Sequence, residues 1–429
     1  MYGQRPRRRS RLVLLGGALL AAAALVPYPH AEASSGTDAD QARRYGVLDA
    51  KADYQATDDD AGVGFYEIDV SWASWEPTRG DDDEDYRQRI REQVGGYVDA
   101  GGVVAISVGL QYPPDWVSDL PDGTLRDQDG NVAPLAPNYA WSASVDRAAA
   151  RYIKDVVDTL GSLVSQYRIG IGDAGETMYP DPKSDPATTW WIGVEFSDLP
   201  EGVDPNPMPG WEPGEATWNG DPVTSEDASR WYDWYLSGLK HSIVSQGKAF
   251  RDAGFDGELA FLAPGQGAHP WLLQERIDAK LADVDNDPYG TVNTGVAYQL
   301  TIPYFAENVS GPLMVNATGA ADDSGVPDER LCRSGDEDVD TSPGSTAMRD
   351  WSSTRWTHAL ASRIGADFEV ESPTVDTSLP DVYQEFQACR ARYLQWLNDE
   401  SLNTGAGDDG TLGIEQYADW IADHPLGSE

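Results

Sequence analysis

Short β-rich runs alternate with amphipathic helical stretches along almost the whole chain. The β-rich runs are residues 45–51, 65–72, 103–110, 167–171, 258–263, 296–302, 313–316 and 366–371. Helical patterns separate most of them, at 85–100, 145–166, 225–253, 271–282 and 346–364. Alternating strands and helices form parallel sheets covered by helices, and eight such units close into a barrel. The pattern therefore predicts an α/β fold, a (β/α)8 TIM barrel.

The predicted barrel carries long loops and a C-terminal tail. Residues 177–224 are rich in Pro, Gly, Trp and Asp, and residues 319–345 are acidic. Both segments follow a predicted strand, so we expect them on the C-terminal face of the barrel, where the active sites of this fold lie. The tail, 381–397 and 414–422, predicts two extra helices packed outside the barrel.

The N-terminal residues have the pattern of a secretory signal peptide. Five arginines between positions 5 and 11 precede an apolar run at 12–26, and Ala31-Glu32-Ala33 is a small-x-small cleavage site. The run is shorter than the roughly 20 residues of a membrane span. Arg8-Arg9 allows a twin-arginine export route. We expect 1–33 to be removed, 34–44 to be a short linker, and 45–429 to be a single secreted domain with no membrane partner.

The chain is strongly acidic, with a formal net charge of -41 at pH 7. Such a surface repels nucleic acid and anionic lipid, so we expect neither as a partner. Many carboxylates favour a halophilic protein, because high salt screens their mutual repulsion. An ordinary acidic secreted enzyme is the alternative interpretation.

Cys332 and Cys389 are the two cysteines of the chain. In an oxidising compartment an even count predicts one disulfide, with two separate buried thiols as the alternative. The five histidines are scattered, which argues against a transition-metal site. The alternating aspartates at 283–287 and 336–340 lack the Gly and Glu of calcium loops. We expect no metal and no cofactor.

Residues 170–180 read Gly-Ile-Gly-Asp-Ala-Gly-Glu-Thr-Met-Tyr-Pro and follow a buried strand. The glycines permit a sharp turn that leaves Glu176 at the strand's end. Glycosidic bonds are cleaved by two carboxyl groups that flank the scissile oxygen, one of which donates a proton. Glu176 is thus a candidate proton donor; a strand-end Glu that caps a helix or faces water is the alternative.

The second predicted strand carries Glu67, Asp69 and Ser71 on one face, which we expect inside the barrel near its mouth. Trp72 and Trp75 follow it, and indole rings stack on the apolar faces of sugars. A buried aromatic pair that closes the barrel is the alternative for the tryptophans. The side chains that we expect to contact a sugar are Asp69, Trp72, Trp75, Tyr112, Asp173, Tyr179, Asn316 and Glu369.

The 170–180 motif resembles the Gly-x-Gly-x-Ala-Gly-Glu-x-x-Tyr-Pro signature of beta-amylases, whose Glu is the general acid. Residues 68–72 are similar to that family's second strand, and this resemblance implies that Asp69 binds sugar. The Trp-x-x-x-Glu-Pro-x-x-Gly pattern at 72–80 and the Pro-Pro-x-Trp step at 113–116 equally resemble family 42 beta-galactosidases. The resemblance covers roughly residues 60–265 and implies a TIM-barrel glycoside hydrolase.

The second half of the chain departs from both families. A beta-amylase carries its base at the end of strand six. The predicted sixth strand of this chain ends in Gln299-Leu300-Thr301-Ile302-Pro303, which contains no acid. A beta-galactosidase carries its nucleophile after strand seven, where the predicted seventh strand, 313–316, ends without an acid. Acids recur at alternate positions of the predicted eighth strand, at 367, 369 and 371. They face either the helices or the barrel interior. Glu371 is the last of these acids along the strand and so the nearest to the mouth of the barrel, which makes it the candidate base or nucleophile. Asp322 and Asp323, beyond the predicted seventh strand, are the next candidates.

Two functions follow from these residues. The first is a secreted glycoside hydrolase that cleaves an extracellular oligo- or polysaccharide with Glu176 and Glu371 and needs no cofactor. The second is a carbohydrate-binding barrel that has lost its chemistry, which the missing acids of the predicted strands six and seven favour.

Overall fold

A computed structural model describes residues 42–127, 130–172, 175–179, 191–192, 195–287, 290–405 and 411–426. The predicted signal peptide and nearly all of the predicted linker lie outside these residues. The described residues fall in one compact unit, Ser34–Glu429. No helix in the described ranges is long and apolar enough to cross a membrane.

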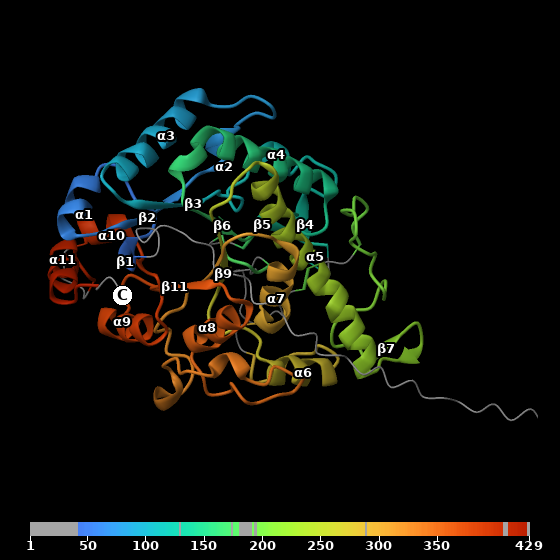
Figure 1. Ribbon diagram of the computed structural model, residues 1–429. Coiled ribbons are helices and arrows are strands. Elements are labelled where there is room, and N and C mark those ends of the chain that lie inside the picture. The colour runs from blue at the N-terminus through green and yellow to red at the C-terminus, as the bar shows by residue number, and fades with distance from the viewer. Residues whose placement is uncertain are drawn as a thin grey trace, which may run out of the picture. The chain divides into compact units, whose positions relative to one another are not determined.

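Eight parallel strands close into a barrel at the centre of this unit, which confirms the predicted (β/α)8 fold (Figure 1). The strands run in chain order around the barrel, with β12 closing against β1. They are β1 (Arg44–Val47), β2 (Phe65–Asp69), β3 (Val103–Ser107), β6 (Gln166–Ile169), β9 (Glu258–Ala263), β10 (Leu313–Ala317), β11 (Asp367–Glu371) and β12 (Tyr393–Trp396).

Helices surround the barrel and cover the outer faces of its strands (Figure 1). Polar caps fix where the longest ones begin: Ser142 accepts a hydrogen bond at the start of α4, and Thr224 forms a capping box with Asp227 at the start of α5. The helices are α1 (Gln55–Ala61), α2 (Trp72–Trp75), α3 (Glu84–Asp99), α4 (Ala143–Leu160), α5 (Ser225–Asp252), α6 (Pro270–Asp278), α7 (Tyr298–Asn308), α8 (Ser353–Ile364), α9 (Leu379–Ala388), α10 (Asp399–Thr404) and α11 (Ile414–Asp423).

Two small hairpins belong to the loops that follow β3 and β6. One pairs β4 (Thr124–Arg126) with β5 (Val132–Pro137), and the other pairs β7 (Thr217–Trp218) with β8 (Asp221–Pro222). Both loops leave the carboxyl ends of barrel strands, and the second hairpin lies in the segment 177–224 that the sequence predicts on the C-terminal face.

Two element predictions are wrong, and together they shift the strand count by one. The apolar run 296–302 belongs to helix α7, because its buried residues Tyr298, Thr301, Ile302 and Phe305 have helical spacing. The eighth strand is β12, inside the tail segment predicted as a helix; all four of its residues are buried, which removes any alternation. Accordingly β10 is the sixth barrel strand and β11 the seventh, and α9 is a barrel helix rather than an added one.

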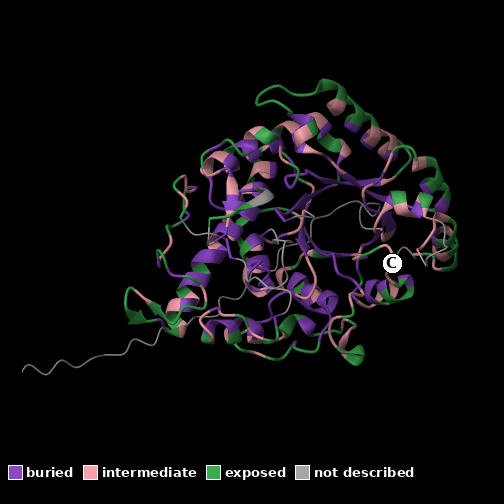
Figure 2. Ribbon diagram, turned by 180° about the vertical axis from the view of Figure 1, so that it is seen from behind, coloured by how far each residue is buried: buried purple, intermediate pink, exposed green. Residues whose placement is uncertain are grey.

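The barrel interior is apolar at its N-terminal end and polar toward its mouth. Phe65 and Tyr393 stack with ring centroids 4.1 Å apart at the apolar end. This cluster comprises Phe65, Val103, Ala105, Ala260, Leu262, Met314 and Tyr393. Two residues further along the strands the same inward face carries Glu67, Glu369 and Gln395, all of them buried. The strands of the barrel are mostly buried (Figure 2). The polar layer leads to the carboxyl ends of the strands, where the fold places active sites.

We expect Phe65→Ala to lower the free energy of unfolding by about 3–5 kcal/mol, because it empties a fully buried ring site inside the barrel. Chemical denaturation of the two proteins measures the difference. Val132→Ala, at a side chain that is 55% exposed, is the matched control and should leave stability nearly unchanged. Equal stability of the Phe65 variant and the parent would contradict the assigned core.

Candidate active site

The glycine-rich turn after β6 explains how Glu176 comes to lie at the barrel mouth. A Cβ at Gly170 would sit 1.8 Å from the carbonyl oxygen of Gly175, and one at Gly172 would sit 2.7 Å from the Cγ of Met178. Gly175 has φ +75°, which favours glycine. The chain therefore folds back onto its own strand more closely than any side chain permits, and this return delivers Glu176. Asp173, predicted to contact sugar, lies outside the described residues.

Hydrogen bonds from neighbouring strands fix the backbone beside Glu176. The Thr177 amide donates to the carbonyl of Leu262 on β9 at 3.0 Å, and its hydroxyl donates to the carbonyl of Ile169 at 2.9 Å. The Glu176 carboxylate itself accepts a 2.6 Å hydrogen bond from the hydroxyl of Thr318, just after β10. Glu176 thus lies across the carboxyl ends of β6, β9 and β10.

Two of the three acids of β11 point into the barrel. Glu369 accepts a hydrogen bond from Gln166 at 3.1 Å, and Glu371 accepts one from Arg168 at 2.9 Å. Both donors lie on β6, which is not a neighbour of β11, so the contacts cross the interior. Asp367 is instead exposed and pairs with Arg392 at the other end of the strand. Of the two orientations that the sequence leaves open, the inward one is correct for Glu369 and Glu371.

Glu371 is the acid at the mouth end of β11. Its pKa is raised to about 7: burial is the largest cause, the Arg168 guanidinium opposes the shift, and the negative charges of Glu176 and Glu67 add to it. The same Oε2 that accepts from Arg168 also accepts from the amide of Asn316 at 3.1 Å. The effect of Glu176 on this pKa places the two carboxylates within electrostatic reach of each other.

Asp69 ends β2 on the same side of the barrel. Burial raises the pKa of its carboxyl well above the usual value, and the charges of Glu67 and Asp49 act in the same direction. Arg168 and Lys51 oppose the shift. Asp69 is only partly buried, so it stays a candidate for sugar binding. Tyr112, which follows β3, is 48% exposed and also stays a candidate.

Trp72 and Trp75 do not line the mouth. Both are fully buried. The Trp72 ring stacks on Tyr152 of α4 with centroids 4.9 Å apart, and the Trp75 indole donates to Asp155 of α4 at 2.6 Å. The prediction that they stack on sugar is wrong, because neither indole has an accessible face.

The Trp-x-x-x-Glu-Pro-x-x-Gly pattern has a structural explanation. The Trp72 indole donates to one carboxylate oxygen of Glu76 at 3.1 Å, and the backbone amide of Gly80 donates to the other at 2.7 Å. The Trp116 indole donates to the Glu76 carbonyl at 3.1 Å. Glu76 therefore ties the loop after β2 to the loop after β3.

Three further predicted sugar contacts are buried behind the mouth. Tyr179 is inaccessible and donates its hydroxyl to the carbonyl of Tyr235 on α5 at 2.8 Å. Asn316 and Glu369 are also fully buried, and their contacts are with the side chains of Glu371 and Gln166. Direct sugar contact by these three is therefore a wrong prediction; Asn316 acts on Glu371 instead.

Arg168 and Thr318 are the site residues that sequence reasoning missed. Gln166 and Arg168 alternate with Tyr167 and Ile169 in one buried strand. That parity places both polar side chains on one face, and a buried arginine needs an anionic partner. This signal could have identified Arg168, whereas the Thr318 contact depends on the path of the chain after β10.

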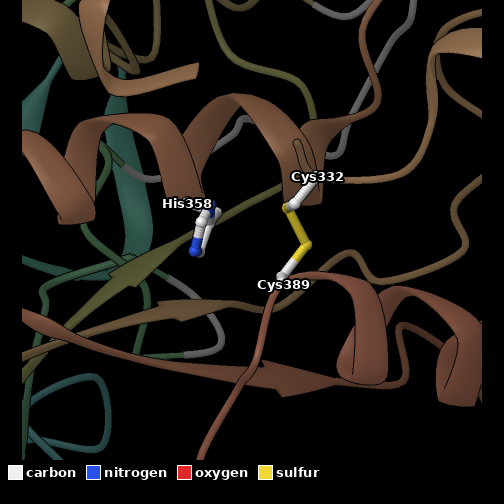
Figure 3. Close-up of side chains that lie close together, drawn as sticks. All are labelled: Cys332, His358 and Cys389. Carbon is white, nitrogen blue, oxygen red and sulfur yellow. A yellow bond between two sulfur atoms is a disulfide. The ribbon is translucent and has the colours of Figure 1, made fainter. Parts of the chain in front are cut away.

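The predicted disulfide is confirmed between Cys332, in the loop after β10, and Cys389, after α9, with Cα atoms 5.0 Å apart. His358 of α8 lies beside it (Figure 3). Cys332, Cys389 and His358 are, in the described part of the chain, the one group of side chains spaced to hold a metal ion. Its sulfurs are bonded to each other, so they are not the thiolates that a metal needs. The aspartate runs are engaged by arginines: Asp283 by Arg276, and Asp336 by Arg355.

Two solved glycoside hydrolases are similar to this chain in fold. The catalytic domain of beta-amylase from Paenibacillus polymyxa matches with a TM-score of 0.59 at 14% identity, over 89% of this chain and 98% of that chain. The chain has the fold of these enzymes. A beta-galactosidase from the psychrophilic Marinomonas ef1 matches with a TM-score of 0.54 at 11% identity, over 89% of this chain and 59% of that chain. Neither a family model nor a curated protein sequence matches.

These matches confirm the sequence resemblance to both families at the level of the fold. Identities of 14% and 11% carry no residue roles or substrates. The roles of the acids therefore depend on the geometry at the mouth of the barrel.

Glu369→Gln should reduce the pH dependence of stability. Burial raises the pKa of Glu369 to about 7, above the ordinary 4.5. The folded protein therefore binds this proton more tightly than the unfolded chain, and stability falls as pH rises from 4.5 to 7. A shift of this size corresponds to a loss on the order of 3 kcal/mol, which the variant should lack. Denaturation at pH 5 and pH 8, at constant salt, measures it.

Asp367→Asn is the control for this experiment, because it removes an exposed acid from the same strand. Its pH dependence should match that of the parent protein. The same slope in the Glu369 variant and the parent would show that Glu369 is not held in a raised-pKa state.

Proposed function

We propose that this protein is a glycoside hydrolase in which Glu176 donates the proton and Glu371 is the nucleophile or base. The observation that carries the proposal is the pair of carboxylates at one barrel mouth, close enough that the charge of Glu176 raises the pKa of Glu371. Hydrolysis of a glycosidic bond needs such a pair in different environments. Glu176 has a hydroxyl partner, and Glu371 has a guanidinium and an amide.

The corrected strand count supports Glu371 as the second carboxylate. Because the predicted strand at 296–302 belongs to helix α7, Glu371 ends the seventh barrel strand rather than the eighth. That is where a beta-galactosidase-like barrel carries its nucleophile. The sixth strand, β10, ends at Ala317 and is followed by Thr318 and Gly319, without the acid expected of a beta-amylase. The site therefore favours the beta-galactosidase-like arrangement.

In this mechanism Glu176 protonates the departing glycosidic oxygen as the bond to the anomeric carbon breaks. Glu371 supplies a negative charge on the other side of that carbon, either attacking it or deprotonating a water that attacks. Asp69 and Tyr112 would bind sugar hydroxyls and ring faces at the edge of the mouth. This chemistry requires no cofactor.

We propose that the substrate is an extracellular oligo- or polysaccharide. The signal-peptide pattern of residues 1–33 supports secretion, and the long loops on the mouth side provide walls for a chain of sugars. The net charge of -41 favours neutral glycans, activity in high salt and no nucleic-acid partner.

A carbohydrate-binding barrel without catalysis is the second candidate. The observation that favours it is the ion pair between Arg168 and Glu371, whose side chain is only 14% exposed. An acid so engaged could serve structure alone. Turnover by the parent protein separates the two candidates, because a binding barrel has no turnover to lose.

Glu176→Gln and Glu371→Gln should each lower kcat on unactivated glycosides by about 10²–10⁴-fold. The Glu176 variant should recover most activity on a dinitrophenyl glycoside, whose leaving group needs no proton, whereas the Glu371 variant should not. A panel of chromogenic glycosides at low and high salt, with calorimetry for saccharide binding, makes the measurement.

Asp367→Asn is the control, since it alters an exposed acid at the far end of the same strand. It should hydrolyse like the parent. Near-parental activity of Glu371→Gln would remove Glu371 from the mechanism, and a parent protein that binds saccharides but cleaves none would favour the binding barrel.

The pH profile should show an acidic limb near pH 7. Glu371 must be ionised to act, and its pKa is raised to about 7, so kcat/KM should fall about tenfold per pH unit below that value. An ordinary glutamate would place the limb near 4.5. Rates measured from pH 4 to 9 at constant ionic strength distinguish the two, and a limb at the ordinary value would contradict the assignment.

A further inference from the structure

Arg168 crosses the barrel interior from β6. Its side chain is only 6% exposed, and Nη2 donates to Oε2 of Glu371 at 2.9 Å and to the amide oxygen of Gln395 at 2.7 Å. The two acceptors belong to β11 and β12, on the opposite wall. A buried guanidinium with two acceptors in place is held in one position.

The two donors to Glu371 bind the same oxygen. Arg168 and the amide of Asn316 both donate to Oε2, and within the described chain no donor binds Oε1. Glu371 keeps 14% of its side chain exposed. Oε1 is therefore the oxygen available to a molecule in the mouth.

The other charged groups around Glu371 are acidic. Glu67 faces it from β2, Glu176 from the turn after β6, and Glu369 lies two residues earlier on its own strand. Burial and these charges favour a protonated Glu371, and Arg168 is the cation that opposes them. Burial lowers the pKa of Arg168, but the charges of Glu371, Glu67 and Glu369 together outweigh it and raise that pKa, so the guanidinium remains charged.

We propose that Arg168 is a positioning residue for the reaction: it fixes Glu371 through Oε2, keeps that carboxylate ionised among acidic neighbours, and leaves Oε1 toward the substrate. The inference rests on the proposed function, since it assigns Arg168 a part in the same site. Arg168 acts through Glu371 and needs no contact with the sugar.

Arg168→Met and Arg168→Gln remove the charge, and Arg168→Lys retains it. The experiment is an NMR titration of the Glu371 carboxyl in ¹³C-glutamate-labelled protein, assigned from the signal that Glu371→Gln lacks. The pKa of Glu371 should rise by about 1–3 units in the Met and Gln variants and by less in the Lys variant. In the same variants the acidic limb of kcat/KM should move upward by the same amount, with KM changed less than kcat.

Arg392→Met is the matched control. Arg392 also pairs with carboxylates, Glu258 and Asp367, but at the N-terminal end of the barrel. Its loss should cost stability without moving the Glu371 titration. The Gln variant retains a polar, uncharged side chain, so it carries the test if the Met variant does not fold.

The outcomes separate the two proposals. An unchanged Glu371 titration in a folded Met or Gln variant overturns the role of Arg168, and activity of the parent then still supports the glycosidase. A parent protein that cleaves no glycoside overturns the function and the catalytic part of the inference. The titration would then still show whether Arg168 holds Glu371 ionised.

Discussion

The ion pair between Arg168 and Glu371 is the interaction on which the polar interior of this barrel depends. Three carboxylates, Glu67, Glu369 and Glu371, lie within reach of one guanidinium. Buried charges are costly unless they are paired and hydrogen bonded, so the acids and Arg168 need each other. The apolar cluster around Phe65 closes the N-terminal end beneath them and excludes water from that side. Fold stability and site chemistry therefore share the same few side chains.

The turn that carries Glu176 is constrained in a different way, by space rather than by charge. Gly170 and Gly175 approach so closely that a methyl group at position 170 would overlap the carbonyl of residue 175. The glycines serve to bring the chain back over its strand, and the bonds of Thr177 hold it there. In this motif Glu176 has the proposed chemical role and the glycines set the path of the backbone, whereas the Glu76 motif after β2 has a structural explanation throughout.

The sequence was sufficient for the barrel, the disulfide and the place of Glu176, because strand-helix alternation, an even cysteine count and close-packed glycines are local signals. It was insufficient where one local pattern is compatible with both a strand and a helix. The run containing Tyr298 and Ile302 has a strand-like composition but helical burial, and β12 is a four-residue strand with no alternation. Trp72 and Trp75 are typical of sugar platforms, yet only tertiary packing against α4 decides that they are buried. Arg168 was within reach of a parity argument, whereas Thr318 was not.

The hydrogen-bond donors at the two acids differ in a way that fits their proposed roles. A hydroxyl can donate or accept, so Thr318 can stay bonded to Glu176 whether that carboxyl is ionised or protonated. Guanidinium and amide nitrogens only donate, so Arg168 and Asn316 favour the ionised form of Glu371. A proton donor must pass through both states in each cycle, while a nucleophile or base begins ionised. The side chains around each acid thus match the order in which a glycosidase would use them.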